Sequence, residues 1–211
     1  MMKYLMGILL LVFVSCGNKE NILLPKTNKT IVKDVVDLSP IYIFFRVKGK
    51  DTLAEVNRKN SIGTTNWVLN IDRRLSLKSV IPEIIKLQEK KRGDSAHKNE
   101  LAQNYYSYAD TIGKNLAFIP FTNVFYKTKK PIDIAGFTFY FRKGNDLVLV
   151  NNHFPIKKSQ VIKSFREINF ENYPQIILIF DENMSYEEYI ENKVLIYELQ
   201  SLNKVSREFI F

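Results

Sequence analysis

Two stretches of the sequence repeat the same order of residue types, and this pattern restricts the fold more than any other feature. Residues 68–81 (VLNIDRRLSLKSVI) and 178–190 (LIFDENMSYEEYI) each run from an apolar strand through Asp, two polar residues, Leu or Met, and Ser into a helix with an apolar face. They are either an internal repeat of two related β-α-β units or an example of what any strand, turn and capped helix share. Both readings predict strands that alternate with helices.

Apolar runs around the first of these stretches predict its neighbouring elements. Residues 40–49 are rich in β-formers and end in a turn, and residues 64–72 predict a second strand. Ser76 is the expected N-cap of the following helix. Pro82 favours the first turn of a helix, so a start nearer Ser79 is the alternative.

The middle of the chain predicts a helix followed by strands. Residues 97–112 are expected to be helical because four apolar side chains recur along one side, namely Leu101, Tyr105, Tyr108 and Ile112. Strands are expected at residues 115–121 and 124–127, where apolar and aromatic residues cluster.

The last third of the chain gives the clearest pattern. Residues 137–152 contain two β-rich runs around Lys-Gly-Asn-Asp, which predicts a hairpin. Ser185 and Glu188 form a capping-box pattern. The elements expected after the hairpin are a helix over 159–168, a strand over 175–181, a helix from Ser185 to about Leu202 and a strand over 206–211. The predicted fold class is α+β, with a mixed or antiparallel sheet and helices packed on one face.

The first sixteen residues predict secretion and lipidation. Lys3 is followed by an uncharged, mainly apolar run from Leu5 to Val14, which ends at Ser15 and Cys16. Such a run is shorter than the roughly 20 residues that cross a bilayer as a helix. The end of the run resembles the lipobox of bacterial lipoproteins, although Phe13 stands where that family usually has Leu. The resemblance implies that Cys16 carries acyl chains such as palmitate and anchors the protein to a membrane.

This reading divides the chain into four parts and places it in the envelope of a Gram-negative bacterium, on the periplasmic face or at the cell surface. The expected parts are a signal peptide over 1–15, a lipidated tether over 16–38, an N-terminal α/β unit over 39–130 and a C-terminal ββαβαβ unit over 131–211. Cys16 is the only cysteine, so a disulfide within one molecule and a cysteine-ligated metal site are excluded.

The C-terminal unit resembles the periplasmic domain of the ExbD/TolR family over about 75 residues. The resemblance rests on the order hairpin, helix, strand, helix, strand, and on six residues in comparable places: Asn151, Asn152, Pro155, Asp181, Ser185 and Tyr186. Members of that family are stator subunits whose membrane helix carries an essential Asp. Residues 1–15 contain no acidic residue. The resemblance therefore implies a dimerising or peptidoglycan-proximal interaction module that does not conduct protons.

The charge balance leaves the partner open. The formal net charge is +9 at pH 7, which in the cytoplasm would suggest nucleic acid. Outside the inner membrane the available polyanions are lipid head groups, lipopolysaccharide and cell-wall polymers, so we expect no nucleic-acid partner. Because Lys and Arg are spread along the chain, simple solvation of the charges is the alternative.

Motifs that carry catalysis are missing from the sequence. There is no G-x-S-x-G, no nucleotide-binding glycine motif and no H-E-x-x-H. His97 and His153 are isolated and are expected to be surface or capping residues. We expect no catalytic residue, no cofactor and no bound metal.

Carboxylates after apolar strands are the remaining candidates for chemistry. Asp72, Asp181 and Glu182 are placed where an acid can project into a cleft, as glycan-cleaving enzymes require. They also precede helix starts, where a carboxylate stabilises the helix dipole. The structural role is preferred over a hydrolase.

The sequence thus predicts a non-enzymatic, lipid-anchored envelope protein that acts as an interaction module, through an envelope partner or self-association, in connection with a TonB/Tol-type energy-transducing system. The alternative is a periplasmic or surface lipoprotein that binds an anionic or glycan ligand.

Overall fold

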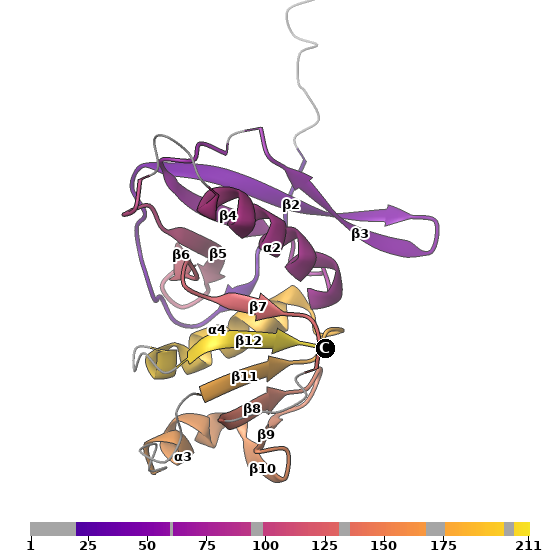
Figure 1. Cartoon of the computed structure of the whole chain (residues 1–211), viewed down its shortest axis with the longest axis vertical. Coiled ribbons are helices and arrows are strands. Elements are labelled where there is room, and N and C mark those ends of the chain that lie inside the picture. The colour runs from indigo at the N-terminus through magenta and orange to yellow at the C-terminus, as the bar shows by residue number, and fades with distance from the viewer. Residues whose placement is uncertain (1–19, 60, 94–98, 131–135, 168–175, 201–204) are drawn as a thin grey trace, which may run out of the picture.

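The computed structural model describes residues 20–59, 61–93, 99–130, 136–167, 176–200 and 205–211. In these residues two six-stranded sheets and three α-helices form an α+β fold with mixed sheets, which confirms the predicted fold class (Figure 1). The first sheet comprises β1 (Lys26–Thr27), β2 (Leu38–Lys48), β3 (Asp51–Asn57), β4 (Asn66–Ile71), β5 (Asn104–Asp110) and β6 (Asn115–Pro120), with α2 (Leu77–Arg92) between β4 and β5.

The second sheet begins with β7, so the chain passes from one sheet to the other between Pro120 and Phe125, a few residues before the boundary expected at 130. Its elements are β7 (Phe125–Lys127), β8 (Phe137–Phe141), β9 (Leu147–Val150), β10 (Phe154–Lys157), the 3-10 helix η2 (Lys158–Gln160), α3 (Val161–Glu167), β11 (Ile176–Phe180), α4 (Tyr186–Gln200) and β12 (Val205–Ile210). The predicted hairpin, helices and strands of this region are confirmed.

Four strands and one helix of each unit share one topology. In the first, hairpin β2–β3 is followed by β4 parallel to β2 and, after α2, by β5 parallel to β4. In the second, hairpin β8–β9 is followed by β11 parallel to β8 and, after α4, by β12 parallel to β11. The two sequence stretches that look alike therefore occupy equivalent places, as two related units would.

Hydrogen bonds between the two units are paired symmetrically around the starts of α2 and α4. The Leu77 N–H donates to Met184 O at 2.9 Å, and the counterpart Tyr186 N–H donates to Leu75 O at 2.7 Å. A second pair follows the same rule, Lys78 N to Glu182 O and Glu187 N to Arg73 O. Ser76 and Ser185 face each other at the centre as an antiparallel bridge. The units are thus related by a local two-fold axis.

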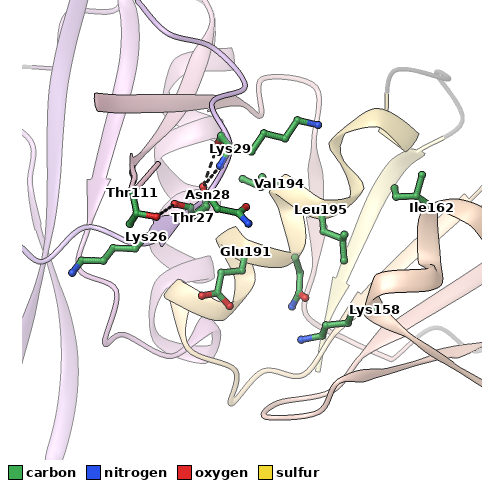
Figure 2. A pocket seen from close by; sticks show the side chains of 11 residues that line it. Lys26, Thr27, Asn28, Lys29, Thr111, Lys158, Ile162, Glu191, Val194 and Leu195 are labelled. Carbon is green, nitrogen blue, oxygen red and sulfur yellow. Dashed lines mark hydrogen bonds between the residues drawn. The ribbon is translucent and has the colours of Figure 1, made fainter. Parts of the chain in front are cut away.

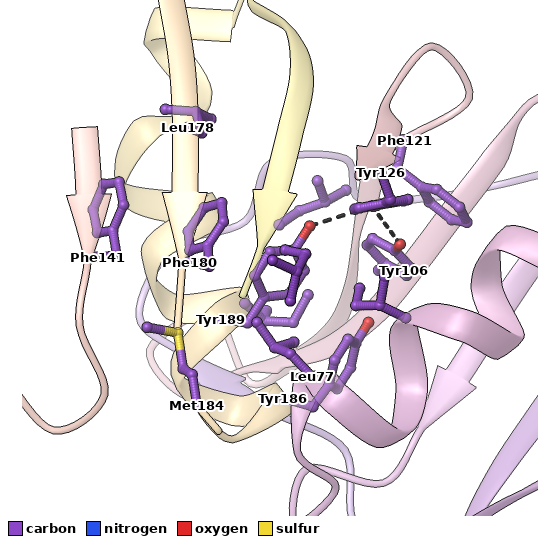
Figure 3. Close-up of a cluster of buried hydrophobic side chains, with 14 of the residues drawn as sticks. Leu77, Tyr106, Phe121, Tyr126, Phe141, Leu178, Phe180, Met184, Tyr186 and Tyr189 are labelled. Atoms are coloured by element: carbon purple, nitrogen blue, oxygen red, sulfur yellow. Dashed lines mark hydrogen bonds between the residues drawn. The ribbon is translucent and has the colours of Figure 1, made fainter. Parts of the chain in front are cut away.

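One hydrophobic core serves both units. The cluster includes Trp67 and Ile71 of the first sheet, Phe139 and Phe180 of the second, and the helix side chains between them. Figure 3 shows Tyr106 and Phe121 of the first unit packed beside Tyr186 and Tyr189 of α4. Burial of this aromatic surface is the main force that holds the sheets together.

A chain of polar contacts crosses the same core. Tyr126 O–H contacts the hydroxyls of Tyr106 at 2.6 Å and Tyr189 at 3.2 Å (Figure 3), and Tyr189 donates to Glu208 at 2.7 Å. Lys193 pairs with the same carboxylate, and both side chains are fully buried. Burial raises the pKa of Tyr106, Tyr126 and Tyr189, so these phenols stay protonated and serve as donors.

The helix expected over 97–112 is wrong for the described residues, which form β5 from Asn104 to Asp110. The side chains used for that prediction do not share a buried face, because Leu101 is 84% exposed and Ile112 is 73% exposed. Tyr106 and Tyr108, two positions apart, are the fully buried pair, as on one face of a strand. Pairing with β4 and β6 on both sides decides the outcome.

The described part of the expected tether, residues 20–38, packs on the domain. β1 pairs with β5, and Val32 forms an antiparallel bridge with Phe118. The Arg73 N–H donates to Leu23 O at 2.8 Å. The sequence of residues 20–38 is rich in Asn and Lys and shows no strand or helix periodicity. Residues far along the chain supply its hydrogen-bond partners, so its structure does not depend on a local pattern.

Candidate functional site

A cleft of about 690 Å³ lies where the N-terminal segment passes α4 (Figure 2). Three lysines line it, Lys26 and Lys29 from the N-terminal segment and Lys158 from η2. Ile162 of α3 and the pair Val194 and Leu195 of α4 supply apolar surface. The cleft therefore combines positive charge with an apolar wall.

Hydrogen bonds to β5 and the residue after it hold the N-terminal wall of the cleft in place. The Thr111 N–H and hydroxyl both donate to Thr27 O, at 2.9 and 2.8 Å. The Tyr108 hydroxyl donates to Lys29 O at 2.9 Å and accepts the Ile31 N–H at 2.9 Å. Burial raises the pKa of Tyr108 to about 12, so it keeps the proton that it donates.

The buried carboxylate of Asp110 holds Thr30, the residue that follows this wall in the chain. Asp110 accepts the Thr30 hydroxyl at 2.6 Å and the backbone N–H groups of Ile112 and Gly113, both at 2.9 Å. The Thr30 hydroxyl and these N–H groups hold the pKa of Asp110 below its usual range. Hydrogen bonds within the protein thus hold the N-terminal wall of the cleft in position.

The opposite wall contains a single carboxylate of unusual basicity. Glu191 of α4 lines the cleft, and burial together with the neighbouring Glu187 raises the pKa of its carboxyl. Lys158 opposes this rise, and its Nζ lies 3.5 Å from Glu188 Oε1. Three lysines and one carboxylate line the cleft, and one of those lysines, Lys158, is already paired with Glu188.

Such an arrangement can hold an anionic group against the lysines and an apolar group against the α4 wall. It offers no nucleophile paired with a base, which acyl or glycosyl transfer requires.

The residues singled out in the sequence do not meet in this cleft. Cys16 and His97 lie outside the described residues. His153 lies in the turn that follows β9 and donates its backbone N–H to Val150 O at 3.1 Å. His153 is exposed, as expected of a surface residue.

Asp72 and Asp181 occupy equivalent turns before α2 and α4. Asp72 is buried, accepts the Arg74 guanidinium at 2.8 and 2.9 Å, and accepts the Leu23 N–H at 3.4 Å. Burial alone would raise the pKa of Asp72, but these contacts lower it. Asp181 accepts the Asn183 N–H at 2.8 Å, and Glu182 pairs with Lys78. All three carboxylates serve their own turns or the unit interface.

The sequence did not predict the cleft lysines as site residues, because Lys26 and Lys29 belong to the segment expected to be a tether. Their only local signal is the alternation of Lys with Thr and Asn, which is also typical of a linker. Lys158 precedes a correctly predicted helix, but nothing in the sequence places that helix opposite Lys26.

Within the described ranges, no group of three or more His, Cys, Asp or Glu side chains lies close enough together to hold a metal ion. Among those residues the helices also fall short of the length and apolarity required to cross a membrane.

Compared with known proteins, the chain matches no protein family, no curated protein and no solved structure.

Proposed function

We propose that this chain is a non-enzymatic, lipid-anchored cell-envelope protein that works by binding an anionic ligand in the cleft between its N-terminal segment and α4. The observation that carries the proposal is the placement of Lys26, Lys29 and Lys158 around one cleft with an apolar wall. The lipid at Cys16, expected from the lipobox resemblance, would hold this cleft close to the polyanions of the envelope.

The ligand class follows from the charges and the surface. An anionic envelope component, such as a cell-wall fragment or lipopolysaccharide, offers carboxylates or phosphates to the lysines and apolar groups to Val194 and Leu195. Contacts of this kind weaken in salt, because the lysines are partly exposed.

Retention of the full-length lipidated protein on purified sacculi and on immobilised lipopolysaccharide tests the proposal. Retention should fall as salt rises, and Lys26→Met and Lys158→Met should each lower it several-fold at low salt. Glu191→Gln should raise retention, since it removes the one carboxylate that lines the cleft.

Lys50→Met is the matched control, because Lys50 lies in the turn between β2 and β3 and does not line the cleft. Retention that ignores salt, or that falls equally in Lys50→Met and Lys158→Met, would refute the cleft as the binding site.

A protein partner is the second candidate, favoured by an edge of the first sheet that no described strand covers. β3 is the last described strand of this sheet, whereas its counterpart β9 is covered by β10. Hairpin β2–β3 projects from the body (Figure 1), and its Val47 and Leu53 are exposed. An exposed edge of this kind accepts a strand from another protein.

This second candidate includes the TonB- or Tol-type components that the ExbD/TolR resemblance implies. A pull-down from crosslinked cells, with wild type beside Cys16→Ala and Leu53→Lys, tests it. Partners enriched by wild type and lost with Leu53→Lys would support the edge. Equal recovery of partners by wild type and Leu53→Lys would rule out the β3 edge as the binding surface.

A further inference from the structure

Strand β3 has no partner strand on the side away from β2 among the described residues, and its register shows which backbone groups this edge offers. Lys48 and Asp51 flank a two-residue turn in which Gly49 has φ +65°, as in a type II′ hairpin. The residues that flank such a turn form a hydrogen-bonded pair, and these pairs alternate along the ladder. The N–H and C=O groups that point away from β2 are therefore those of Thr52, Ala54 and Val56.

The second unit shows what covers the equivalent edge. Val56 of β3 lies opposite Ile43, and Val148 of β9 lies opposite Phe141. Ile43 and Phe141 are equivalent, since each carbonyl accepts the N–H of the aspartate that begins the repeated turn, at 3.0 and 3.1 Å. In the second unit β10 adds an antiparallel strand, with Ile156 opposite Val148. Val148 is fully buried, whereas Val56 is partly exposed, so the place that β10 fills is open beside β3.

Two grooves flank this open edge, one on each face of the sheet. The groove on the α2 side has a volume of about 610 Å³, and its lining includes Ala54 of β3 and Glu83 of α2. The groove on the opposite face has a volume of about 690 Å³, and its lining includes Glu55 of β3 and the ring of Tyr42. Alternate side chains of an added strand point to opposite faces, so they would enter the two grooves in turn.

The charges of the second groove are ordered along β3. At one end Glu20 and Glu55 share a single guanidinium, that of Arg46, at 2.5 and 2.6 Å. Toward the other end Arg58 and Lys59 line the groove, and Arg58 pairs with a carboxylate of α2. Glu55 and Arg58 are three residues apart on an extended chain, about 10 Å. A cation of the added strand is therefore favoured opposite Glu55.

We infer that the β3 edge binds an extended segment of a partner protein in antiparallel orientation, with an apolar residue opposite Val56 and a lysine or arginine opposite Glu55. This rests on the protein-partner candidate proposed above and is independent of the cleft. β10 has this chemistry at the equivalent places, where Ile156 is followed by Lys157. Hydrogen bonds to the backbone of β3 supply affinity, and the two side chains specify the register.

A peptide of residues 152–158, Asn-His-Phe-Pro-Ile-Lys-Lys, carries this pattern and serves as the probe. We would titrate the fluorescein-labelled peptide with the full lipidated protein in neutral detergent and measure fluorescence anisotropy. Wild type should give a saturable rise. The same peptide with Ile156→Asp should bind about tenfold more weakly or worse, because a carboxylate replaces the apolar side chain beside Val56.

A proline on β3 tests the backbone contacts. Val56→Pro removes the N–H that faces the peptide and leaves the neighbouring hydrogen bonds to β2 in place, so it should weaken binding about tenfold or more. Thr52→Pro is the matched control, because it makes the same change on β3 outside the stretch opposite the peptide, and it should leave binding unchanged. Circular dichroism of both variants checks the fold.

An exchange of charges tests the register and stays decisive if Val56→Pro does not fold. Glu55→Lys should weaken binding of the original peptide about two- to fivefold and strengthen binding of the peptide with Lys157→Glu by a similar factor. Asp51→Lys is the matched control, because it places the same charge on β3 beyond the end of the peptide. It should do neither.

The inference is overturned if the peptide shows no saturable binding. It is also overturned if wild type, Val56→Pro and Glu55→Lys bind equally, which would indicate exchange with β10 of the protein itself. Cellular partners lost with Leu53→Lys, together with no peptide binding, would uphold the edge as an interface and reject this chemistry of its partner. Peptide binding with the expected variant pattern but no retention on sacculi would uphold the inference and reject the cleft.

Discussion

Among the described residues two charged side chains are buried completely, and their contribution to stability follows from that burial. Lys193 of α4 pairs with Glu208 of β12, and the same carboxylate accepts the Tyr189 hydroxyl. A buried pair of this kind is costly to break on one side only, because the remaining charge keeps its desolvation penalty without a partner.

We expect Lys193→Met to lower the free energy of unfolding by about 3–5 kcal/mol. The double variant Lys193→Met/Glu208→Gln should recover a large part of that loss, because Gln is uncharged and still accepts the Tyr189 hydroxyl. Urea unfolding followed by circular dichroism measures both. A double variant no more stable than the single one would contradict this account of the pair.

Lys91 should make stability depend on pH in the alkaline range. Burial lowers the pKa of Lys91 to about 8 in the folded protein, against about 10.4 for an unfolded lysine. Between these values the unfolded state binds more protons, so the free energy of unfolding contributed by Lys91 rises with pH.

The rise should amount to about 1–2 kcal/mol after allowance for partial exposure of the side chain. It is obtained as the difference between wild type and Lys91→Met in urea unfolding at pH 7.5 to 10.5, values chosen to bracket the two pKa values. The difference between the two proteins should change across this range. A constant difference would show that Lys91 titrates normally.

At the scale of elements, the two equivalent helix starts differ in their caps. Ser185 Oγ accepts the Glu188 N–H at 3.2 Å, whereas Ser76 makes no such bond and contacts Ser79 Oγ. The capping box is half complete, since the Glu188 carboxylate accepts the Gly144 N–H at 2.9 Å instead. Gly144 has φ +62°, which explains a glycine in that turn.

We expect Ser185→Ala to cost about 1 kcal/mol of stability and Ser76→Ala only a few tenths, since only the first removes a cap. Thermal unfolding of the two variants side by side tests this. Equal losses would mean that the Ser185 cap contributes no more to stability than the contact between the Ser76 and Ser79 hydroxyls.

Elements with strong local signals were predicted well and those that depend on distant partners were not. The hairpin at Gly144, the strand at Ile176–Phe180 and the helix after Ser185 carry their own turn, apolar and capping residues. α2 begins after Ser76, and Pro82 lies within it instead of in its first turn. β1 and β5 have weak local signals, because their hydrogen-bond partners lie far along the chain.

The candidate sites were harder still to predict. The cleft requires Lys26 to face α4. No short sequence motif encodes that juxtaposition. Asp72, for which the sequence favoured a structural role over a catalytic one, accepts the Arg74 N–H and guanidinium within its own turn.

For the whole molecule, the shared core means that the two units unfold together. Trp67 reports on the first unit, and Phe180 of the second packs against Phe141 and Tyr189 in the same core cluster. We expect Phe180→Ala to cost about 3–5 kcal/mol and to shift the Trp67 fluorescence transition together with the circular dichroism transition.

Leu53→Ala, at an exposed hairpin position, is the control and should shift neither transition. If Phe180→Ala proves too unstable, Phe180→Leu gives a smaller shift with the same coincidence of probes. A Trp67 transition that stays in place while circular dichroism changes would show that the units unfold independently.

The local two-fold axis between Ser76 and Ser185 has a consequence for stoichiometry. A dimer of identical subunits displays each of its surfaces in duplicate, so any ligand meets two equal sites. Here both halves belong to one polypeptide and differ in sequence, and the cleft takes Lys26 and Lys29 from one half and α4 from the other. A rotation about the local axis that exchanges the two halves does not produce a second copy of the cleft. Because both halves belong to one chain, a nearly symmetric scaffold can therefore offer a single binding site.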